Sequence, residues 1–267
     1  MNGSTQTAPL RINPGLTFPP GEAPHRSNGR LFIRLAQTAE EIDAALKLRY
    51  EVFNLELGEG LTSAFRTGRE CDEFDLDSEH VIIVDRMQQR VIGTFRLRTY
   101  EIAKTTAGFY SSRQFDLSAL PPEILAHAIE IGRPCIARSH RNLEAQMLLL
   151  KGLGVSLLQK NKRYLFGSLS LSTRDPMQAG RVFDQLSQEG HLHPEFRLMP
   201  RPGFKCLWYR SSSDGNGAEI AISNWIGTCL QFGAKLCGPP ALNRQFRTIE
   251  LPFFLDGKQL DEISSQA

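Results

Sequence analysis

The sequence predicts an α/β fold in which a mixed β-sheet of about six or seven strands is flanked by helices. From Leu31 onward, short apolar segments rich in β-branched and aromatic residues alternate with longer segments whose apolar residues recur at helical spacing. No repeat or low-complexity segment interrupts residues 29 to 262. We therefore expect one domain over residues 29–267, preceded by a disordered tail over residues 1–28 that is rich in Pro, Gly, Ser, Thr and Asn.

Each element is predicted from its local pattern. Thr38, followed three residues later by Glu41, is a capping-box signature for a helix start, and the polar turn RMQQ between two apolar runs indicates a hairpin. In chain order, the predicted elements are a strand at 31–36, a helix at 38–58, hairpin strands at 80–85 and 90–98, a loop and short helix over 108–126, a strand at 128–137, a helix at 142–162, a strand at 164–171, a helix at 175–190, a strand at 204–209, a helix at 219–234 and a strand-rich end over 235–256.

Composition excludes several functional classes. The 31 basic and 29 acidic residues leave a net charge of +2, which gives no field that would attract nucleic acid. The number of cysteines, 5, is odd, and none is spaced as CxxC, which favours a reducing cytoplasm over a disulfide framework or a zinc site. We expect Cys135 to be a core thiol, and His191 with His193 to be a loop pair rather than a metal site. The sequence shows no signal peptide and no apolar run long enough to span a membrane, although peripheral membrane contact stays open.

The strand at 128–137 carries two charged residues where a central strand is normally apolar. Carboxylates and guanidiniums are rarely buried in a sheet unless they are paired, and strict alternation would point Glu130 and Arg133 to opposite faces. Gly132 and Pro134 flank Arg133 and are typical of a β-bulge, which re-aims side chains. Glu130 is therefore either a general base whose pKa is raised by burial or one half of a structural ion pair with Arg133.

An acidic segment, DEFD, precedes the strand at 80–85. Asp72 and Asp75 are three residues apart in a predicted loop, where one turn would aim both inward. The segment is either a solvated acidic loop or half of a charged cluster. Asp77 and Glu79 have no assignable counter-charge and are expected to be solvated. For Asp72 and Asp75, the counter-charges that the chain offers are Arg49, Arg96 and Arg133.

Four short pieces, in this order, resemble the acyl-homoserine lactone synthases and the related N-acyl amino acid synthases. The pieces are R-x-x-x-F from Arg49 to Phe53, D-x-F-D from Asp72 to Asp75, VIG-x-x-R ending at Arg96, and E-x-x-R from Glu130 to Arg133. GFYSSRQFDLS, EIGRPCI followed by HRN, and GAKLCGPPALNRQFRTIE are more similar to the ornithine–acyl carrier protein N-acyltransferases, some of which carry hemolysin-like labels. The resemblance covers about residues 30 to 260.

The resemblance implies a GNAT-like acyltransferase fold. It also implies transfer of a long-chain acyl group, with or without a 3-hydroxyl, from acyl carrier protein to the α-amine of an amino acid, with ornithine as the first expectation. Glu130 would be the base, or the relay to a water that acts as base. The implied acceptor side, in which several charged groups mainly pair with one another, consists of Arg49, Phe53, Asp72, Asp75, Arg96 and Arg133. No metal is implied, and no cofactor beyond the donor's 4′-phosphopantetheine arm.

The donor side is predicted at the segment RSHRN, which opens a helix. A helix N-terminus next to Arg138, His140 and Arg141 is a sound anion site, and the absence of a glycine-rich pyrophosphate loop favours a carrier protein over free CoA. The basic KNKR segment at 160–163 is either a contact for an acidic carrier protein or a solvated helix end.

Alternative functions stay open from the sequence. The lactone synthases carry a Trp a few residues after the Phe, where this chain has NLELGEG, which favours an open-chain amino acid acceptor. The same chemistry on another amine, such as glycine, tyrosine or a signal precursor, is one alternative. A catalytically silent acyl-carrier or lipid-binding module is another. Because a lyso-ornithine lipid is amphipathic, a site of action at the cytoplasmic face of the membrane is expected.

Overall fold

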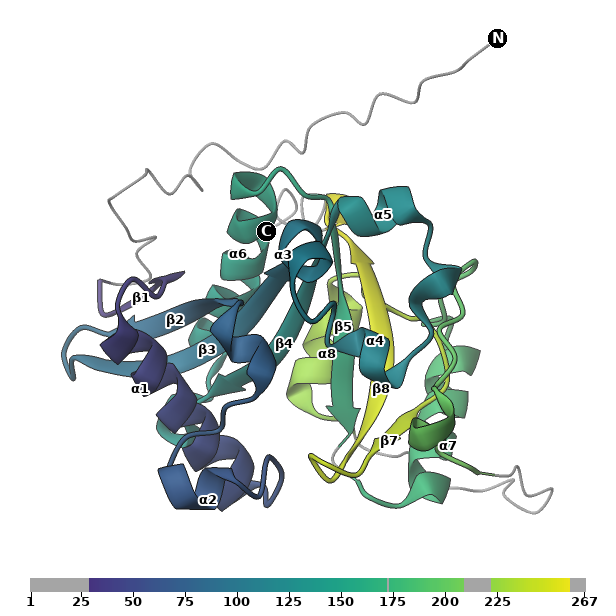
Figure 1. The fold of residues 1–267 in the computed structure, drawn as a ribbon, viewed down its shortest axis with the longest axis horizontal. Helices are drawn as coiled ribbons and strands as arrows, with labels where there is room; N and C mark the ends of the chain where they lie inside the picture. The colour runs from purple at the N-terminus through teal and green to yellow at the C-terminus, as the bar shows by residue number, and fades with distance from the viewer. Residues whose placement is uncertain (1–28, 172, 209–221, 260–267) are drawn as a thin grey trace, which may run out of the picture.

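The computed structural model describes residues 29–171, 173–208 and 222–259 (Figure 1), so the tail expected over residues 1–28 lies outside the described part. The predicted mixed sheet flanked by helices is confirmed, with eight strands in the order β1-β2-β3-β4-β5-β8-β6 and β7 paired to β8. The strands are β1 (Leu31–Leu35), β2 (Glu79–Asp85), β3 (Arg90–Thr99), β4 (Ala128–Ile136), β5 (Tyr164–Leu171), β6 (Lys235–Leu236), β7 (Ala241–Asn243) and β8 (Thr248–Asp256).

Most of the helices lie in the intervals that the sequence predicts, with some differences in extent. The α-helices are α1 (Ala39–Arg49), α2 (Ala64–Thr67), α3 (Tyr100–Thr105), α4 (Ser111–Gln114), α5 (Pro122–Ala126), α6 (Leu143–Gln159), α7 (Pro176–Gln188) and α8 (Asn224–Gln231). A π-helix, η1 (Tyr50–Glu56), follows α1 directly, and short 3₁₀ turns are η2 (Glu73–Leu76), η3 (Leu117–Ala119), η4 (Arg138–His140) and η5 (Pro202–Phe204). The sequence patterns do not predict α2 or α3, which lie outside the expected helical intervals.

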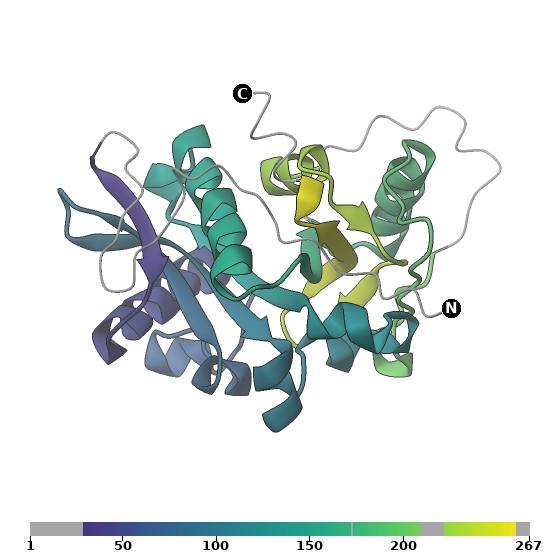
Figure 2. The same cartoon turned by 90° about the horizontal axis from the view of Figure 1, so that it is seen from above.

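The first four strands form an antiparallel half-sheet that is covered on both faces. The β2–β3 hairpin turns over residues 86–89, as predicted. Figure 2 shows α1 on one face of these strands and α6 on the other. The side chain of Thr38 accepts a hydrogen bond from the Glu41 backbone N–H, which confirms the predicted N-cap of α1. Most of the hydrophobic core lies between these layers.

The sheet divides between β4 and β5. The two strands pair in parallel only from Ala128 opposite Tyr164 to Ile131 opposite Gly167. Beyond that point β4 continues against β3, while β5 continues against β8. The described parts of β4 and β5 therefore leave backbone edges unpaired on either side of a gap, and this gap is where the candidate site forms.

A bulge in β4 follows directly after the last β4–β5 pair. Gly132 lies opposite Arg96 and Cys135 lies opposite Thr94, so two residues of β4 face one residue of β3. Arg133 has φ of 56°, a left-handed conformation that is uncommon for a residue with a side chain. The bulge that Gly132 and Pro134 predict is thus confirmed, and it turns the Arg133 side chain out of strict strand alternation.

One predicted strand is wrong. Over 204–209 the structure has only the end of η5 and an isolated bridge from Lys205 to Ala241, and residue 209 lies outside the described part. Trp208 packs instead against α7, where its ring lies 5.9 Å from that of Phe183 and fills the space above Gly180. Trp208 thus covers a helix face, while Leu207 is exposed, so the segment does not form a strand ladder.

The predicted helix over 219–234 is shorter than expected. Residues 219–221 lie outside the described part, and α8 begins at Asn224.

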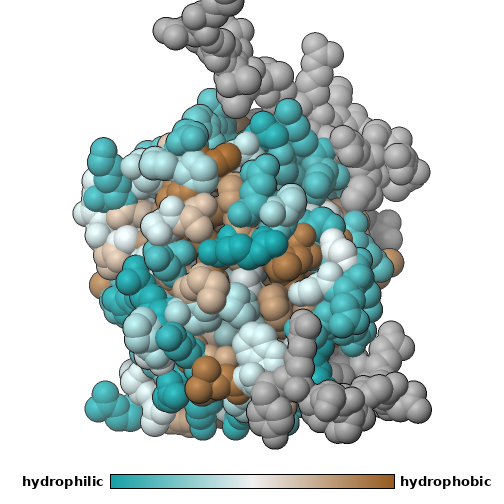
Figure 3. Space-filling model, turned by 90° about the vertical axis from the view of Figure 1, so that its right-hand side faces the viewer, coloured by the Kyte–Doolittle hydropathy of each residue, from teal (hydrophilic) through white to brown (hydrophobic). Residues whose placement is uncertain are grey.

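Near α7 and the C-terminal strands, hydrophobic residues appear on the surface in small patches between hydrophilic ones (Figure 3). The described residues on that side of the molecule therefore present no broad apolar surface.

Gly167 should be sensitive to substitution because it lies where β4 and β5 separate. A Cβ at this position would stand 2.4 Å from the carbonyl oxygen of Ile131, a backbone atom that moves only if the strands move. We expect Gly167→Ala to lower the free energy of unfolding by about 1–3 kcal/mol, measured by urea denaturation. Gly203→Ala is the matched control, because a Cβ added at Gly203 would meet no atom within 4 Å. Equal stability of the two variants would contradict the close approach.

Candidate active site

A cavity of about 600 Å³ lies in the gap between β4 and β5 and is called the site cavity below. One part of its wall is apolar and consists of Val52, Phe53, Leu57, Ile131, Pro134, Cys135, Ile136, Leu149, Leu169, Leu171 and Trp225. The other part is polar and includes Glu59, Arg96, Arg98, Tyr110, Ser111, Glu130, Arg133, Ser168, Ser170 and Glu250. A cavity lined by both apolar and charged residues suits a molecule that has a hydrocarbon chain and a polar group.

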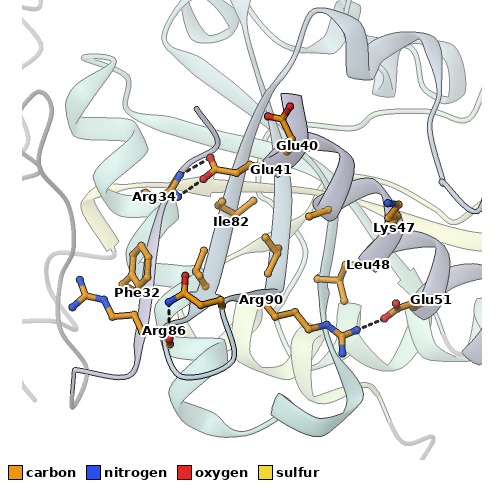
Figure 4. A pocket seen from close by; sticks show the side chains of 14 residues that line it. Phe32, Arg34, Glu40, Glu41, Lys47, Leu48, Glu51, Ile82, Arg86 and Arg90 are labelled. Carbon is orange, nitrogen blue, oxygen red and sulfur yellow. Dashed lines mark hydrogen bonds and ion pairs between the residues drawn. The ribbon is translucent and has the colours of Figure 1, made fainter. Parts of the chain in front are cut away.

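A second cavity, of about 620 Å³, lies between α1 and the strands β1 to β3 (Figure 4). Ion pairs span its rim, from Arg34 to Glu41 and from Arg90 to Glu51 at 2.6 Å. The guanidinium of Arg86 stacks on Phe32. None of the residues predicted from the sequence to bind substrate lines this second cavity, so the site cavity is the candidate active site.

Glu130 lies on β4, is buried, and lines the site cavity. Its two carboxylate oxygens accept hydrogen bonds from the backbone N–H of Tyr110 at 2.8 Å and of Ser111 at 2.6 Å. Burial raises the pKa of Glu130, and the hydrogen bonds from the Ser111 and Tyr110 segment oppose that shift without cancelling it. A carboxylate with a raised pKa is suited to accept a proton.

The alternative ion pair between Glu130 and Arg133 does not form. The Arg133 guanidinium binds Glu70 instead, with 2.8 Å between Nη2 and Oε1. It is also held between two aromatic rings, with Cζ 3.9 Å from the centre of the Phe53 ring and 4.4 Å from that of Phe246. Cation–π contacts of this kind favour a desolvated guanidinium, so Phe53 acts here by holding Arg133 in place.

Asp72 and Asp75 of DEFD belong to a buried charged network, which confirms the charged-cluster interpretation over that of a solvated loop. Arg49, which is 1% exposed, pairs with Asp75 at 2.6 Å and with Glu70 at 2.5 Å. Arg96 pairs with Asp72 at 2.5 Å and with Asp75 at 3.0 Å. The network therefore joins α1, η2 and β3, and through Glu70 it reaches the bulge of β4.

A capping box sets the local geometry of the two aspartates. The Asp72 side chain accepts from the Phe74 N–H at 2.9 Å, and Asp75 accepts from the Asp72 N–H at 2.8 Å. The segment is thus a 3₁₀ turn rather than the predicted loop, and the reciprocal bonds aim both carboxylates at the arginines. Asp77 is exposed, as expected, whereas Glu79 is not simply solvated because it pairs with Lys160.

Glu70 is a site residue that the sequence analysis missed. It has 0% exposure and contacts both Arg49 and Arg133. Burial raises its pKa, but the guanidiniums of Arg133 and Arg49 outweigh burial and hold the pKa below its usual value. The sequence signal was weak, because Glu70 follows a run of polar residues in RTGRE that is typical of a solvated loop.

The predicted donor residues separate in the structure. Arg141 lines the site cavity and pairs with Glu56. His140 is buried against Asp85, with 3.2 Å between Nε2 and Oδ2, and Arg138 is exposed on η4. Neither His140 nor Arg138 lines the site cavity. Their role toward an acyl donor stays a prediction.

The basic KNKR segment is neither a free cationic patch nor a solvated helix end. Lys160 pairs with Glu79, Lys162 with Glu101 at 2.5 Å, and Arg163 with Asp256. Lys162 also donates to the carbonyl of Ala126 at 2.7 Å. These cations tie the end of α6 to neighbouring elements, so their charges are already matched within the chain.

The cysteine and histidine residues singled out in the sequence are packed within the fold. Cys135 is buried, and burial raises the pKa of its thiol to about 12, which agrees with a core thiol. His193 stacks on Phe196 with 4.2 Å between ring centres. Within residues 29–171, 173–208 and 222–259, no group of three or more His, Cys, Asp or Glu is placed to hold a metal ion. A metal-free reaction stays a prediction.

Removal of the Asp75 charge should cost stability, because it leaves Arg49 and Arg96 buried with fewer partners. We expect Asp75→Asn to lower the free energy of unfolding by about 3–5 kcal/mol at pH 7. Burial alone would raise the Asp75 pKa, but Arg49 and Arg96 hold it well below its usual value. A lowered folded-state pKa stabilises the protein above the unfolded pKa of about 3.9, and this contribution is lost as the pH falls further.

Urea denaturation at pH 7 and pH 5 checks this expectation. The stability difference between wild type and Asp75→Asn should be at least as large at pH 5 as at pH 7. His80 Nε2 lies 3.9 Å from Asp75, and loss of the Asp75 charge lowers the pKa of His80 further, which disfavours the folded state where an unfolded His is protonated. Asp77→Asn, at an exposed position on the same turn, is the control and should change stability by less than about 0.5 kcal/mol. If the two variants were equally stable, the network would not contribute as described.

Comparison with known proteins supports an acyltransferase. A family model described as an acetyltransferase (GNAT) domain matches residues 48–151. A curated protein of Rhodobacter capsulatus named L-ornithine N(alpha)-acyltransferase is 30% identical over 239 residues, which cover 86% of this chain and 91% of the relative. A protein of the same name from Rhizobium meliloti is 27% identical over 231 residues, 82% of this chain and 77% of the relative.

Solved structures share less sequence with the chain. A CoA-dependent acyl-homoserine lactone synthase, solved with SAM and isopentyl-CoA, is 15% identical, with a TM-score of 0.47 over 85% of this chain and 82% of that one. The extent of the match to the Rhodobacter protein, together with the GNAT domain match, is decisive. The chain belongs to the L-ornithine N(alpha)-acyltransferase family, and it is an acyltransferase with a GNAT domain.

Proposed function

We propose that the protein transfers a long-chain acyl group from acyl carrier protein to the α-amine of ornithine, giving a lyso-ornithine lipid. The observation that carries the proposal is the buried Glu130 carboxylate in the wall of a cavity that is lined by both apolar and charged residues. The family relationship supports ornithine as the acceptor.

The reaction is a direct aminolysis of the acyl thioester. The acceptor enters as an ammonium and must lose a proton to expose its lone pair, and Glu130 has the raised pKa that suits this step. The amine nitrogen then attacks the thioester carbonyl, the C–N bond forms and the C–S bond breaks. Of the two protons that the nitrogen loses, one goes to the leaving thiolate and the other to solvent.

The divided sheet offers a place for the thioester. Beyond Ile131 the described part of β4 has no ladder partner on its β5 side, so backbone groups there remain free to bind a ligand. A backbone N–H at this edge would stabilise the tetrahedral oxyanion. The acyl chain would follow the apolar wall past Leu149, Leu169 and Trp225.

Ornithine would meet the polar wall with its carboxylate toward Arg133. This guanidinium lies against the rings of Phe53 and Phe246, and its Nε and Nη2 atoms face Glu70, so Nη1 is the atom left for a ligand carboxylate. A fixed guanidinium matches the planar geometry of a carboxylate. The other charged residues of the network then act mainly by holding Arg133 and η2 in place, because their charges are already paired.

Membrane contact would occur near the entrance to the site cavity. Leu57 lines the cavity and is 45% exposed, and Leu55 on η1 is 59% exposed. No helix in the described part of the chain is long and apolar enough to cross a membrane. Peripheral contact of these leucines with the cytoplasmic face of a membrane would let an amphipathic product leave without crossing water.

Glu130→Gln should lower kcat by about 100-fold or more, because the amide does not accept a proton. It should also lower the Tm. The two carboxylate oxygens accept one backbone N–H each, and in Gln one of these oxygens is replaced by an NH₂ group, which cannot accept. In the wild type, kcat/KM should rise with pH through a pKa above that of an ordinary glutamate, since the ionised form is the base. If the folded Glu130→Gln variant no longer shows this rise of kcat/KM with pH, Glu130 is the base. Near-normal turnover of the variant would exclude Glu130 as the base.

The choice of donor is tested with palmitoyl carrier protein and palmitoyl-CoA under the same conditions. We expect kcat/KM to be much higher with the carrier protein and to fall with added salt, since the partner is acidic. Arg138→Glu should raise KM for the carrier protein, whereas Arg181→Glu on the exposed face of α7 makes the same charge change elsewhere. Comparable kcat/KM for the two donors would defeat the carrier-protein assignment.

A further inference from the structure

Two carboxylates of the site cavity have no part in the aminolysis outlined above. Glu59 follows η1, Glu250 lies on β8, and both line the same cavity as Glu130. Neither forms an ion pair with another residue in the described part of the chain. A buried or half-buried carboxylate without a counter-charge is costly, so their placement needs a physical reason.

Glu250 is 4% exposed, and it is held from one side only. Its Oε1 atom accepts from Asn243 Nδ2 at 3.1 Å and from Thr248 Oγ1 at 2.8 Å. Asn243 is itself fixed by a second bond to the Tyr110 hydroxyl at 2.7 Å. Both bonds end on Oε1, so Oε2 has no partner among the described residues. Because Glu250 lines the site cavity, this oxygen is an acceptor available to a ligand there.

Glu59 is half-buried, and three arginines influence it: Arg133 and Arg174, which have partners elsewhere, and Arg247, which is exposed. The Arg174 guanidinium donates to the carbonyl of Gly58 at 2.8 Å. The Arg133 guanidinium is taken up by Glu70. Burial raises the pKa of Glu59, and the arginines Arg133, Arg174 and Arg247 oppose that shift without cancelling it. Because Glu59 and Glu250 line the same cavity, a cation bound there would offset the negative charge of both.

We propose that Glu59 and Glu250 bind the protonated side-chain amine of the acceptor and so select an α-amino acid that carries a second amine. This inference rests on the proposed function, in which the α-amine of the acceptor faces Glu130. An ammonium offers three donors and no acceptor, which matches two carboxylates that lack donors. The division of charge then orients the substrate, with the carboxylate toward Arg133 and the second amine toward Glu59 and Glu250.

The arrangement also explains how a cavity rich in guanidiniums accepts a doubly cationic substrate. The lining includes Arg96, Arg98 and Arg133. Arg96 and Arg133 are paired with carboxylates of the network, whereas Glu59 and Glu250 form no ion pair among the described residues. A site that hydrogen-bonds a substrate amine rejects the analogue that lacks it, because its own polar groups then stay unpaired.

The test compares ornithine with norvaline, which has the same carbon chain and α-amine but no side-chain amine. We expect the wild type to prefer ornithine in kcat/KM by about 100-fold or more. Glu59→Gln and Glu250→Gln should each reduce this preference by at least about tenfold, mainly through KM for ornithine. Glu123→Gln, at an exposed glutamate outside the cavity, is the matched control. Thermal melting confirms that each variant is folded.

The outcomes separate the inference from the function on which it rests. If the wild type acylates ornithine and prefers it to norvaline, but both folded variants keep that preference, the carboxylate pair does not read the second amine. An equal loss for the two substrates would likewise assign Glu59 and Glu250 a structural role. If the wild type acylates another amine and not ornithine, the proposed acceptor is wrong, and the inference fails with it.

Discussion

The buried guanidinium of Arg49 fixes the parts of the chain that make up the site. It lies at the end of α1 and binds Glu70 and Asp75, which come from two separate points of the segment between α1 and β2. Glu70 then binds Arg133 in the bulge of β4, and Asp75 shares its charge with Arg96 of β3. Because each buried charge depends on the others for its pairing, these elements can take only one mutual arrangement.

That arrangement determines the shape of the gap in the sheet. The bulge at Arg133 comes directly after the last pair between β4 and β5, so the turn of the backbone and the separation of the strands coincide. Tyr110 and Ser111, which bind Glu130 through their backbone N–H groups, complete the polar wall from the opposite side. Fold and chemistry therefore meet at one place: the strand that opens the sheet also carries the proposed base.

The cavity separates its charges by function. Arg96, Arg133 and Arg141 pair with carboxylates of the chain. Arg98 and Arg174 donate to carbonyl oxygens, which do not cancel their charge. Glu130 is held by backbone donors, Glu250 is held from one side only, and the Glu59 carboxylate has no hydrogen bond or ion pair among the described residues. Burial raises the pKa of Glu130 and of Glu59. The same residue type can thus serve as base or as ligand.

The sequence by itself determined the order of the elements and the chemistry of the site strand. Local signals suffice there, because a capping box, a hairpin turn and a Gly-x-Pro bulge act over a few residues, and the family motifs occur in the expected order. Only the tertiary structure decided which charges pair. Arg133 pairs with Glu70 and not with Glu130. Trp208 packs on α7, and Glu79 pairs with Lys160. All three contacts join residues that are distant in the chain. Periodicity and propensity carry no information about such contacts, since these depend on which elements the folded core brings together.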